Sequence, residues 1–424
     1  MLDKLLPKSS YVRNVITLMT GTSIAQAIPI AISPILTRLY SPEEFGVFAL
    51  YVAIVSIVSV LATGRYQFAI MLPKNDRDAM HVVALVIGLS FIVSVVLFLV
   101  VMTFNVQITK LLNADDISIW LYWIPVSTLL VSILTSLNYW CIRRGSFRRI
   151  SGNRVLQSGS TALVQLAGGS QNIGMYGLLG GQIAGQTICC AALSTLIYRE
   201  NKALVKRIKK EKIIAFAKKY VNFPKYLIFG HGISNVAWEA PIFFLNAIFT
   251  ASSAGFYMLT QRVLGVPVTF VSTAFADVFR REASLSYVSE GQCIGIYKRT
   301  LKNLLLLAVL PSILFFFTAP YIFSLVFGEK WRVAGEYAQI LTPVFFCEFV
   351  IYPLSSMFMI AEKQKFDLLW QIANLLLIIL AFVFGAYSSN VKVALLLYSS
   401  AYFIMSLTNG FISWKLAAGA WKNK

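Results

Sequence analysis

Apolar stretches of about 18 or more residues recur along this 424-residue chain, and they constrain its fold more than any other feature. Each is long enough to cross a hydrocarbon core of about 30 Å as a helix. Membrane-spanning strands would alternate apolar and polar residues over about ten positions, and these stretches do not alternate. Composition agrees, because 58% of the residues are hydrophobic and only 13% are charged. The sequence therefore predicts an all-α, multi-pass membrane protein.

We expect twelve transmembrane helices, and the basic residues provide a check on that number. The expected spans are residues 14–37, 45–71, 80–103, 117–141, 153–170, 174–198, 221–249, 254–277, 302–327, 334–360, 366–388 and 391–415. Under this count the loops on one side of the membrane hold only Arg38, Lys110, Lys330, Arg332 and Lys392. Nearly all other Lys and Arg residues lie on the opposite side, with both termini. Because basic residues accumulate in cytoplasmic loops, both termini are expected in the cytoplasm.

The chain also reads as two similar halves. The segment "SPEEFGVFALY" follows the first expected span, and "TASSAGFYMLTQ" follows the seventh, about half the chain later. Residues 199–220 form the longest and most charged connection. We therefore expect a six-helix bundle over residues 1–198, a cytoplasmic linker over 199–220 and a second six-helix bundle over 221–424. Six is an even number, so the halves would be a parallel repeat with one orientation.

Several other functional classes find little support. The basic run "KALVKRIKKEKIIAFAKK" is compatible with nucleic-acid or lipid contact, but we interpret it as a cytoplasmic loop that obeys the same charge rule, beside lipid headgroups. No nucleic-acid partner and no cofactor are expected. The five cysteines show no metal-ligand spacing, so no metal is expected. Gly177, Gly181 and Gly185 recur at four-residue spacing, which favours close packing of two helices.

Apart from residues at the very ends of spans, three basic residues fall inside the expected spans, namely Arg65, Lys225 and Arg262. A charge at the centre of a membrane helix costs roughly 2.5–3.5 kcal/mol on insertion scales. Arg65 lies eight residues before Pro73, which corresponds to about 12 Å of helix. Lys225 is near enough to the end of its span to reach the cytoplasm. Arg262 lies near the middle of the membrane.

Polar and acidic residues accompany these cations. Glu239 and Glu348 lie deep within their spans. In the span 221–249, the residues Lys225, His231, Asn235, Glu239 and Asn246 fall within an arc of roughly 120° on a helix. Such a stripe does not face lipid.

Two interpretations of these buried charges remain open. They could form ion pairs that fix helix packing, for example Arg262 with Glu239. Alternatively, they could line a hydrated cavity in which the cations hold an anionic substrate, since the planar guanidinium of Arg suits phosphate. Glu239, His231, Asn235 and Glu348 are then candidates for ion coupling or for the polar lining of the cavity.

Five segments in order along the chain resemble the polysaccharide flippases of the Wzx type. They are "RLYSPEEFGVFALY", "GRYQFAIMLP", "YWCIRRGSFRRISGNRVLQS", "LTQRVLGVP" and "VFGEKWRVAGEYAQILTP". This family lies within the multidrug/oligosaccharidyl-lipid/polysaccharide exporter superfamily. The resemblance implies a MATE-like fold of two six-helix bundles in the bacterial inner membrane. Its members often carry an acid where Gln67 stands here, so ion coupling or sugar recognition is expected to differ.

The resemblance also implies a function. The family moves undecaprenyl-pyrophosphate-linked oligosaccharides for O-antigen or capsule from the cytoplasmic to the periplasmic leaflet by alternating access. Arg65, Lys225 and Arg262 would then contact the pyrophosphate. Energy would come from a proton or sodium gradient, or from consumption of the product, and a polysaccharide polymerase and assembly proteins are candidate partners. A multidrug exporter of the same superfamily, and a polysaccharide polymerase or ligase, are the alternatives.

Overall fold

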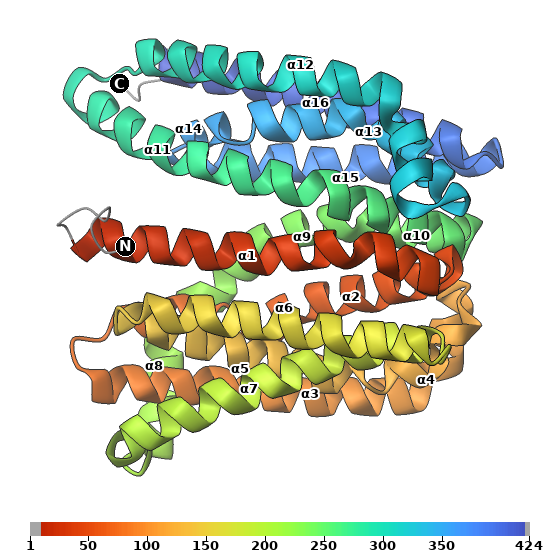
Figure 1. The fold of residues 1–424 in the computed structure, drawn as a ribbon. Helices are drawn as coiled ribbons and strands as arrows, with labels where there is room; N and C mark the ends of the chain where they lie inside the picture. The colour runs from red at the N-terminus through yellow and green to blue at the C-terminus, as the bar shows by residue number, and fades with distance from the viewer. Residues whose placement is uncertain (1–9, 420–424) are drawn as a thin grey trace, which may run out of the picture. The chain divides into compact units, whose positions relative to one another are not determined.

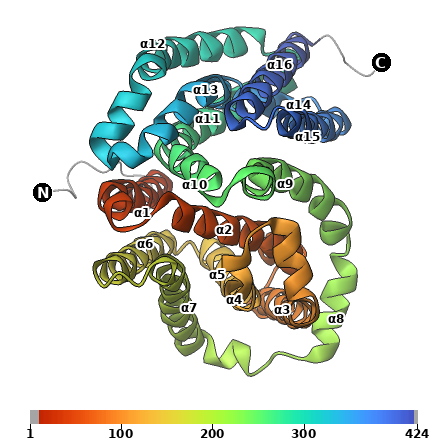
Figure 2. The same ribbon diagram turned by 90° about the vertical axis from the view of Figure 1, so that its right-hand side faces the viewer.

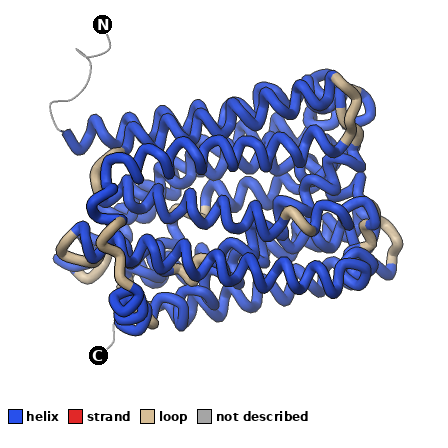
Figure 3. The backbone as a smooth tube through the Cα atoms, turned by 90° about the horizontal axis from the view of Figure 1, so that it is seen from below, coloured by secondary structure: helices blue, strands red, loops and turns tan. Residues whose placement is uncertain are grey.

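The computed structural model describes residues 10–419, except for the side chains of residues 10–17 and of His231. Every regular element within residues 10–419 is a helix (Figures 1 and 3). The internal contacts divide the chain into two compact units, Met1–Asn235 and Val236–Lys424. The all-helical class expected from the sequence is therefore confirmed. The predicted bundle boundary at residues 199–220 stays a prediction.

The first unit is built from long helices joined by short helical turns. In chain order its elements are α1 (Ser10–Leu39), α2 (Pro42–Ala62), η2 (Tyr66–Met71), α3 (Asp76–Leu112), η3 (Asp115–Ile117), α4 (Ser118–Leu121), α5 (Ile124–Arg143), α6 (Phe147–Ser170), α7 (Met175–Val205), α8 (Lys210–Lys219), η4 (Phe223–Leu227) and the first part of α9 (Ile228–Phe244).

The second unit continues from the remainder of α9. Its further elements are η5 (Leu245–Phe249), α10 (Ala251–Thr260), η6 (Gln261–Gly265), α11 (Val266–Glu290), α12 (Ile294–Phe327), η7 (Glu329–Trp331), α13 (Arg332–Val350), η8 (Leu354–Ser356), α14 (Met357–Ile360), α15 (Gln364–Tyr387) and α16 (Val391–Ala417). Three of the short elements, η4, η5 and η6, are π-helical turns next to α9 and α10.

Within residues 10–419, eight helices are long and apolar enough to cross a membrane. They are Leu18–Leu39, Pro42–Ala62, Asp76–Leu112, Ile124–Arg143, Ala251–Glu290, Ile294–Phe327, Gln364–Tyr387 and Val391–Ala417. A ninth arises if Glu329–Val350 and Leu354–Ile360, bent by 47°, are one span. The expected spans at 153–170, 174–198 and 221–249 are helical but are rich in Gly, Ser and Gln or are interrupted by π-turns. The twelve-span count stays a prediction.

The two segments that suggested a repeat both begin a helix with a hydroxyl cap. Ser41 precedes α2, and its Oγ accepts a hydrogen bond from the backbone N–H of Glu44 at 3.3 Å, while the Glu44 carboxylate accepts one from the Ser41 N–H at 2.7 Å. Thr250 precedes α10, and its hydroxyl accepts from the backbone N–H of Ser253 at 3.2 Å. Both arrangements satisfy backbone donors that a helix start leaves without partners.

The glycine spacing in α7 allows close packing on α6, as expected, and α6 also packs against α1 (Figure 2). A Cβ on Gly181 would lie 2.5 Å from Cγ of Gln165, and one on Gly185 would lie 2.0 Å from Oγ1 of Thr161. A Cβ on Gly177 would lie 2.1 Å from the hydroxyl of Tyr40. These positions therefore have room only for hydrogen.

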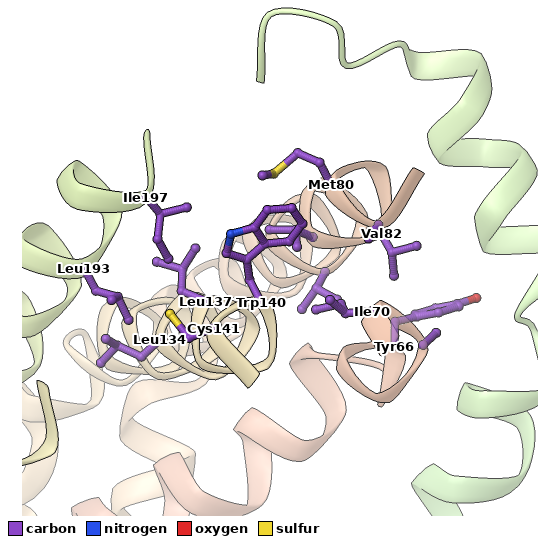
Figure 4. Close-up of a cluster of buried hydrophobic side chains, with 14 of the residues drawn as sticks. Tyr66, Ile70, Met80, Val82, Leu134, Leu137, Trp140, Cys141, Leu193 and Ile197 are labelled. Carbon is purple, nitrogen blue, oxygen red and sulfur yellow. The ribbon is translucent and has the colours of Figure 1, made fainter. Parts of the chain in front are cut away.

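A buried apolar cluster joins η2, α3, α5 and α7 in the first unit (Figure 4). Its members include Tyr66 and Ile70 from η2, Trp140 from α5 and Ile197 from α7. All five cysteines of the chain are buried free thiols, in agreement with their interpretation as small apolar fillers. The cluster matters for function because it anchors η2, which begins directly after Arg65.

Candidate functional site

Arg65 lies at a break between two helical elements. Helix α2 ends at Ala62, and the next two residues after Thr63 both adopt left-handed backbone conformations, with φ of 54° at Gly64 and 56° at Arg65. The 3₁₀ helix η2 then starts at Tyr66. The expected continuous span over 45–71 is therefore interrupted. A non-glycine residue in this conformation costs roughly 1–2 kcal/mol, and such strain concentrates at functional positions.

The Arg65 side chain is half-buried among aromatic rings. Its Cζ lies 6.0 Å from the centroid of the Phe68 ring. The Phe68 ring in turn packs edge to face on Tyr139 of α5, with centroids 5.4 Å apart and an angle of 74°. Nε of Arg65 is buried with no hydrogen-bond partner among the described residues, and no carboxylate there forms a salt bridge with it. No described carboxylate therefore neutralises its charge.

A salt-bridge cluster holds the other end of η2. The carboxylate of Asp76, at the start of α3, accepts a hydrogen bond from Nε of Arg143 at 3.0 Å and a second from Arg144. Nη1 of Arg143 also donates to the carbonyls of Ile70 and Met71, at 3.2 and 3.3 Å. The sequence analysis placed Arg143 and Arg144 in a cytoplasmic loop and did not foresee that they fix the turn after Arg65.

A cavity of about 380 Å³ adjoins this cluster. Its lining includes Asp76, Arg143 and Arg144 together with Arg149 of α6 and Glu200 of α7. Arg149 and Glu200 form a bidentate pair at 2.6 and 2.7 Å. The Arg149 hydrogen bonds hold the pKa of the Glu200 carboxyl below its ordinary value. Since both acids of the lining already engage its arginines, this cavity is not a strong anion site.

The remaining predicted residues of the first unit lie in η4 and in the first part of α9. Lys225 is exposed in η4, and its Nζ lies 5.5 Å from the centroid of the Tyr226 ring. The amide oxygen of Asn235 accepts a hydrogen bond from the hydroxyl of Ser56 in α2 at 3.3 Å. The side chain of His231 lies outside the description. Part of the predicted polar stripe on α9 therefore contacts α2.

In the second unit, Arg262 lies in η6 and Glu239 in α9, and both are half-buried. Each makes interactions with its surroundings, so neither is a free charge. The roles predicted for Arg262 and Glu239 stay predictions.

Glu348 of α13 belongs to a tyrosine network that the sequence analysis missed. The hydroxyl of Tyr402 in α16 donates a hydrogen bond to the Glu348 carboxylate. The Tyr402 ring lies 6.2 Å from that of Tyr398, whose hydroxyl is hydrogen-bonded to Tyr257. Nε2 of Gln261 donates to the Tyr257 hydroxyl at 3.2 Å. No sequence signal marks this network, because tyrosines are common throughout the chain.

Comparisons with known proteins agree with this architecture. A family profile described as "Polysaccharide biosynthesis protein" matches residues 35–336. No curated protein sequence matches the chain. Among solved structures, the chain is similar to the inward-facing conformation of a multidrug resistance MATE family transporter of the MOP superfamily, at 12% identity and a TM-score of 0.69, covering 95% of each chain.

Two further solved structures share the fold. One is a MOP superfamily transporter from Pyrococcus furiosus, at 14% identity and a TM-score of 0.65, covering 97% of this chain and 96% of that one. The other is a mutant of the Vibrio cholerae MATE transporter VcmN, at 12% identity and a TM-score of 0.63, with the same coverage. At these identities the likeness establishes the fold, which is that of MOP superfamily transporters.

Proposed function

Because this chain belongs to the polysaccharide biosynthesis protein family, we propose that it is a flippase for undecaprenyl-pyrophosphate-linked oligosaccharides. It moves O-antigen or capsule repeat units from the cytoplasmic to the periplasmic leaflet of the bacterial inner membrane. It works by alternating access, in which the substrate site opens first to one side of the membrane and then to the other. The polyprenyl tail remains in lipid while the polar head crosses.

The observation that carries this proposal is the environment of Arg65. A half-buried guanidinium without a carboxylate partner among the described residues is costly in a membrane protein, unless an anionic ligand is present during the working cycle. A pyrophosphate offers planar arrays of oxygens that match the fork of guanidinium donors. In this role Arg65 attracts the head group, Lys225 acts nearer the cytoplasm and Arg262 acts deeper.

Glu239, His231, Asn235 and Glu348 supply coupling or the polar lining of the cavity. A proton or sodium gradient, or consumption of the product by a polysaccharide polymerase and its assembly partners, provides the direction of transport. The protein also contacts membrane lipids through its exposed apolar helices.

A multidrug exporter is the second candidate, since MATE transporters share the fold. A cavity for cationic drugs would favour acids, whereas Arg65 favours an anion. The Pyrococcus furiosus transporter is one for which reverse polarity of the binding pocket suggests a different function. A polymerase or ligase is less well supported, because catalytic enzymes of that kind are expected to carry a large outer loop.

The proposal is tested in cells that lack their own flippase and depend on this protein for surface polysaccharide. Arg65→Ala and Arg262→Ala should abolish surface polysaccharide while the protein still accumulates in the membrane. Lys110→Ala, an exposed residue at the end of α3, is the matched control and should leave it intact. Glu239→Gln should lose only the dependence on an ion gradient. Normal polysaccharide in both arginine variants would rule out the assigned role.

A further inference from the structure

Arg65, Phe68 and Tyr139 form a contiguous group of half-buried side chains in the first unit. The three side chains are half-buried, while the neighbouring side chains of Tyr66, Gln67, Ala69 and Ile70 in η2 are buried. Cζ of Arg65 lies 6.0 Å from the centroid of the Phe68 ring, and the Phe68 ring packs edge to face on Tyr139 with centroids 5.4 Å apart, so the cation lies beside an aromatic pair.

Aromatic packing alone does not account for this arrangement. A cation gains from an aromatic ring at such a distance, but an exposed contact of this kind is worth only about 0.5–1 kcal/mol. That is less than the roughly 1–2 kcal/mol that the left-handed backbone of Arg65 costs. The buried Nε of Arg65 also has no partner among the described residues. An anionic ligand on the accessible part of the guanidinium would offset these costs through its charge.

The rings specify more than charge. A phosphate needs only the guanidinium, whereas the negative face of an aromatic ring attracts the weakly positive C–H groups of a pyranose ring. The two kinds of contact lie side by side. A ligand that satisfies both carries a phosphate directly bonded to a sugar.

The position of Tyr139 along α5 also suits contact with the bond between a diphosphate and its sugar. Tyr139 lies four residues before Arg143, the last residue of α5, which corresponds to about 6 Å along a helix. The positive-inside rule assigns that end of α5 to the cytoplasmic side. A sugar attached to the diphosphate of a lipid in the cytoplasmic leaflet lies at this level.

We propose that Phe68 and Tyr139 form a subsite for the sugar bonded directly to the diphosphate, with Arg65 on the adjoining phosphate. This inference rests on the proposed function and assigns specificity-determining residues to it. The subsite discriminates a glycosylated from a bare polyprenyl diphosphate. Sugars farther along the repeat unit contact other surfaces.

The test measures binding of two lipids to the purified full-length protein in detergent: undecaprenyl pyrophosphate, and the same lipid carrying one hexose. The wild type should bind the glycosylated lipid roughly three- to tenfold more tightly, as expected of aromatic contacts. Phe68→Leu and Tyr139→Leu keep apolar bulk but remove the aromatic faces. Each should bring the ratio of the two dissociation constants toward one, with little change for the bare lipid. Arg65→Ala should weaken both lipids equally.

Two further variants sharpen the result. Tyr139→Phe keeps the ring and should retain most of the discrimination, and a loss as large as in Tyr139→Leu would exclude stacking. Phe98 and Tyr122 form a comparable pair, with centroids 6.3 Å apart, in the same unit. Phe98→Leu is therefore the matched control and should leave the ratio unchanged. Only variants that remain monodisperse on size exclusion are compared.

The outcomes separate this inference from the proposed function. If the wild type binds neither lipid, the flippase assignment fails. If it binds both and the ratio is the same in Phe68→Leu, Tyr139→Leu and the wild type, the sugar subsite is wrong while the flippase assignment stands.

Discussion

At the scale of single residues, Arg65 combines an unfavourable backbone with a side chain placed for a ligand. Glycine would adopt the left-handed backbone conformation found at Arg65 without the steric cost that a side chain imposes. We therefore expect Arg65→Gly to stabilise the protein by about 1 kcal/mol while it abolishes transport. Arg65→Ala should abolish transport without this gain, because alanine retains the strain. Thermal unfolding midpoints of the two purified variants in detergent measure the difference.

Gly64 provides the control for that comparison, because it precedes Arg65 and has nearly the same φ, 54°. A Cβ on Gly64 would also lie 2.7 Å from Cδ2 of Leu89. Gly64→Ala should therefore lower the unfolding midpoint. Equal midpoints for Arg65→Gly and Arg65→Ala would show that the backbone at Arg65 carries no strain.

A second prediction at this scale concerns the two arginines that share Asp76. The Arg143 side chain is 12% exposed and also bonds two carbonyls of η2, whereas Arg144 is 51% exposed. Buried hydrogen bonds to charged groups contribute about 1.5–3 kcal/mol, and exposed ion pairs contribute below about 1 kcal/mol. Arg143→Ala should therefore destabilise the protein more than Arg144→Ala does. Unfolding midpoints of both variants test the order, and a larger effect at Arg144 would contradict it.

The sequence located the charged residues of the candidate site but not their partners. Arg143 and Asp76 are 67 positions apart, and Tyr402 and Glu348 are 54 apart. No local pattern links residues at such separations, because their proximity arises from helix packing. Arg65 could be recognised as unusual from its apolar neighbours alone, whereas its aromatic neighbour Tyr139 could not.

At the scale of elements, the long helices follow directly from the apolar runs, and the interruptions do not. The sequence predicted one span over 45–71, but the structure breaks it at residues 63–65. The expected span over 334–360 likewise divides into α13, η8 and α14. Average hydropathy does not register a change in backbone dihedrals, so such breaks are invisible to it. The π-turns η4, η5 and η6 are hidden for the same reason.

The contact between α6 and α7 predicts opposite effects on stability for two glycine substitutions in α7. A Cβ on Gly185 would meet Oγ1 of Thr161 at 2.0 Å, whereas a Cβ on Gly180 would meet nothing within 4 Å. Gly185→Ala should destabilise the protein by about 1–3 kcal/mol through overpacking. Gly180→Ala should stabilise it by roughly 0.5–1 kcal/mol, because alanine is the better helix former. Unfolding midpoints of the two variants in detergent measure these changes. Equal destabilisation by Gly185→Ala and Gly180→Ala would refute the close contact at Gly185.

At the scale of the whole molecule, the fold class followed from composition and apolar runs, and the number of membrane crossings did not. Eight or nine helices of the described residues meet simple criteria of length and hydropathy. The additional expected spans contain polar residues that would be solvated by neighbouring helices or by a cavity. Hydropathy treats a helix as if lipid surrounded it, so it undercounts helices that line an aqueous path. The prediction of twelve membrane spans rests instead on the distribution of basic residues.

That distribution yields the last prediction, which concerns topology. Single cysteines replace Lys110, Lys209, Lys363 or Lys392 in a variant whose five native cysteines are replaced by alanine. With twelve spans, a membrane-impermeant maleimide should label positions 110 and 392 in intact spheroplasts. Positions 209 and 363 should be labelled only after permeabilisation. These four side chains are exposed or half-buried, so access does not limit the reaction. Labelling of position 209 in intact spheroplasts would show that α6 and α7 do not both cross the membrane. A reversed result at position 363 or 392 would show that the predicted topology is wrong in the second half of the chain.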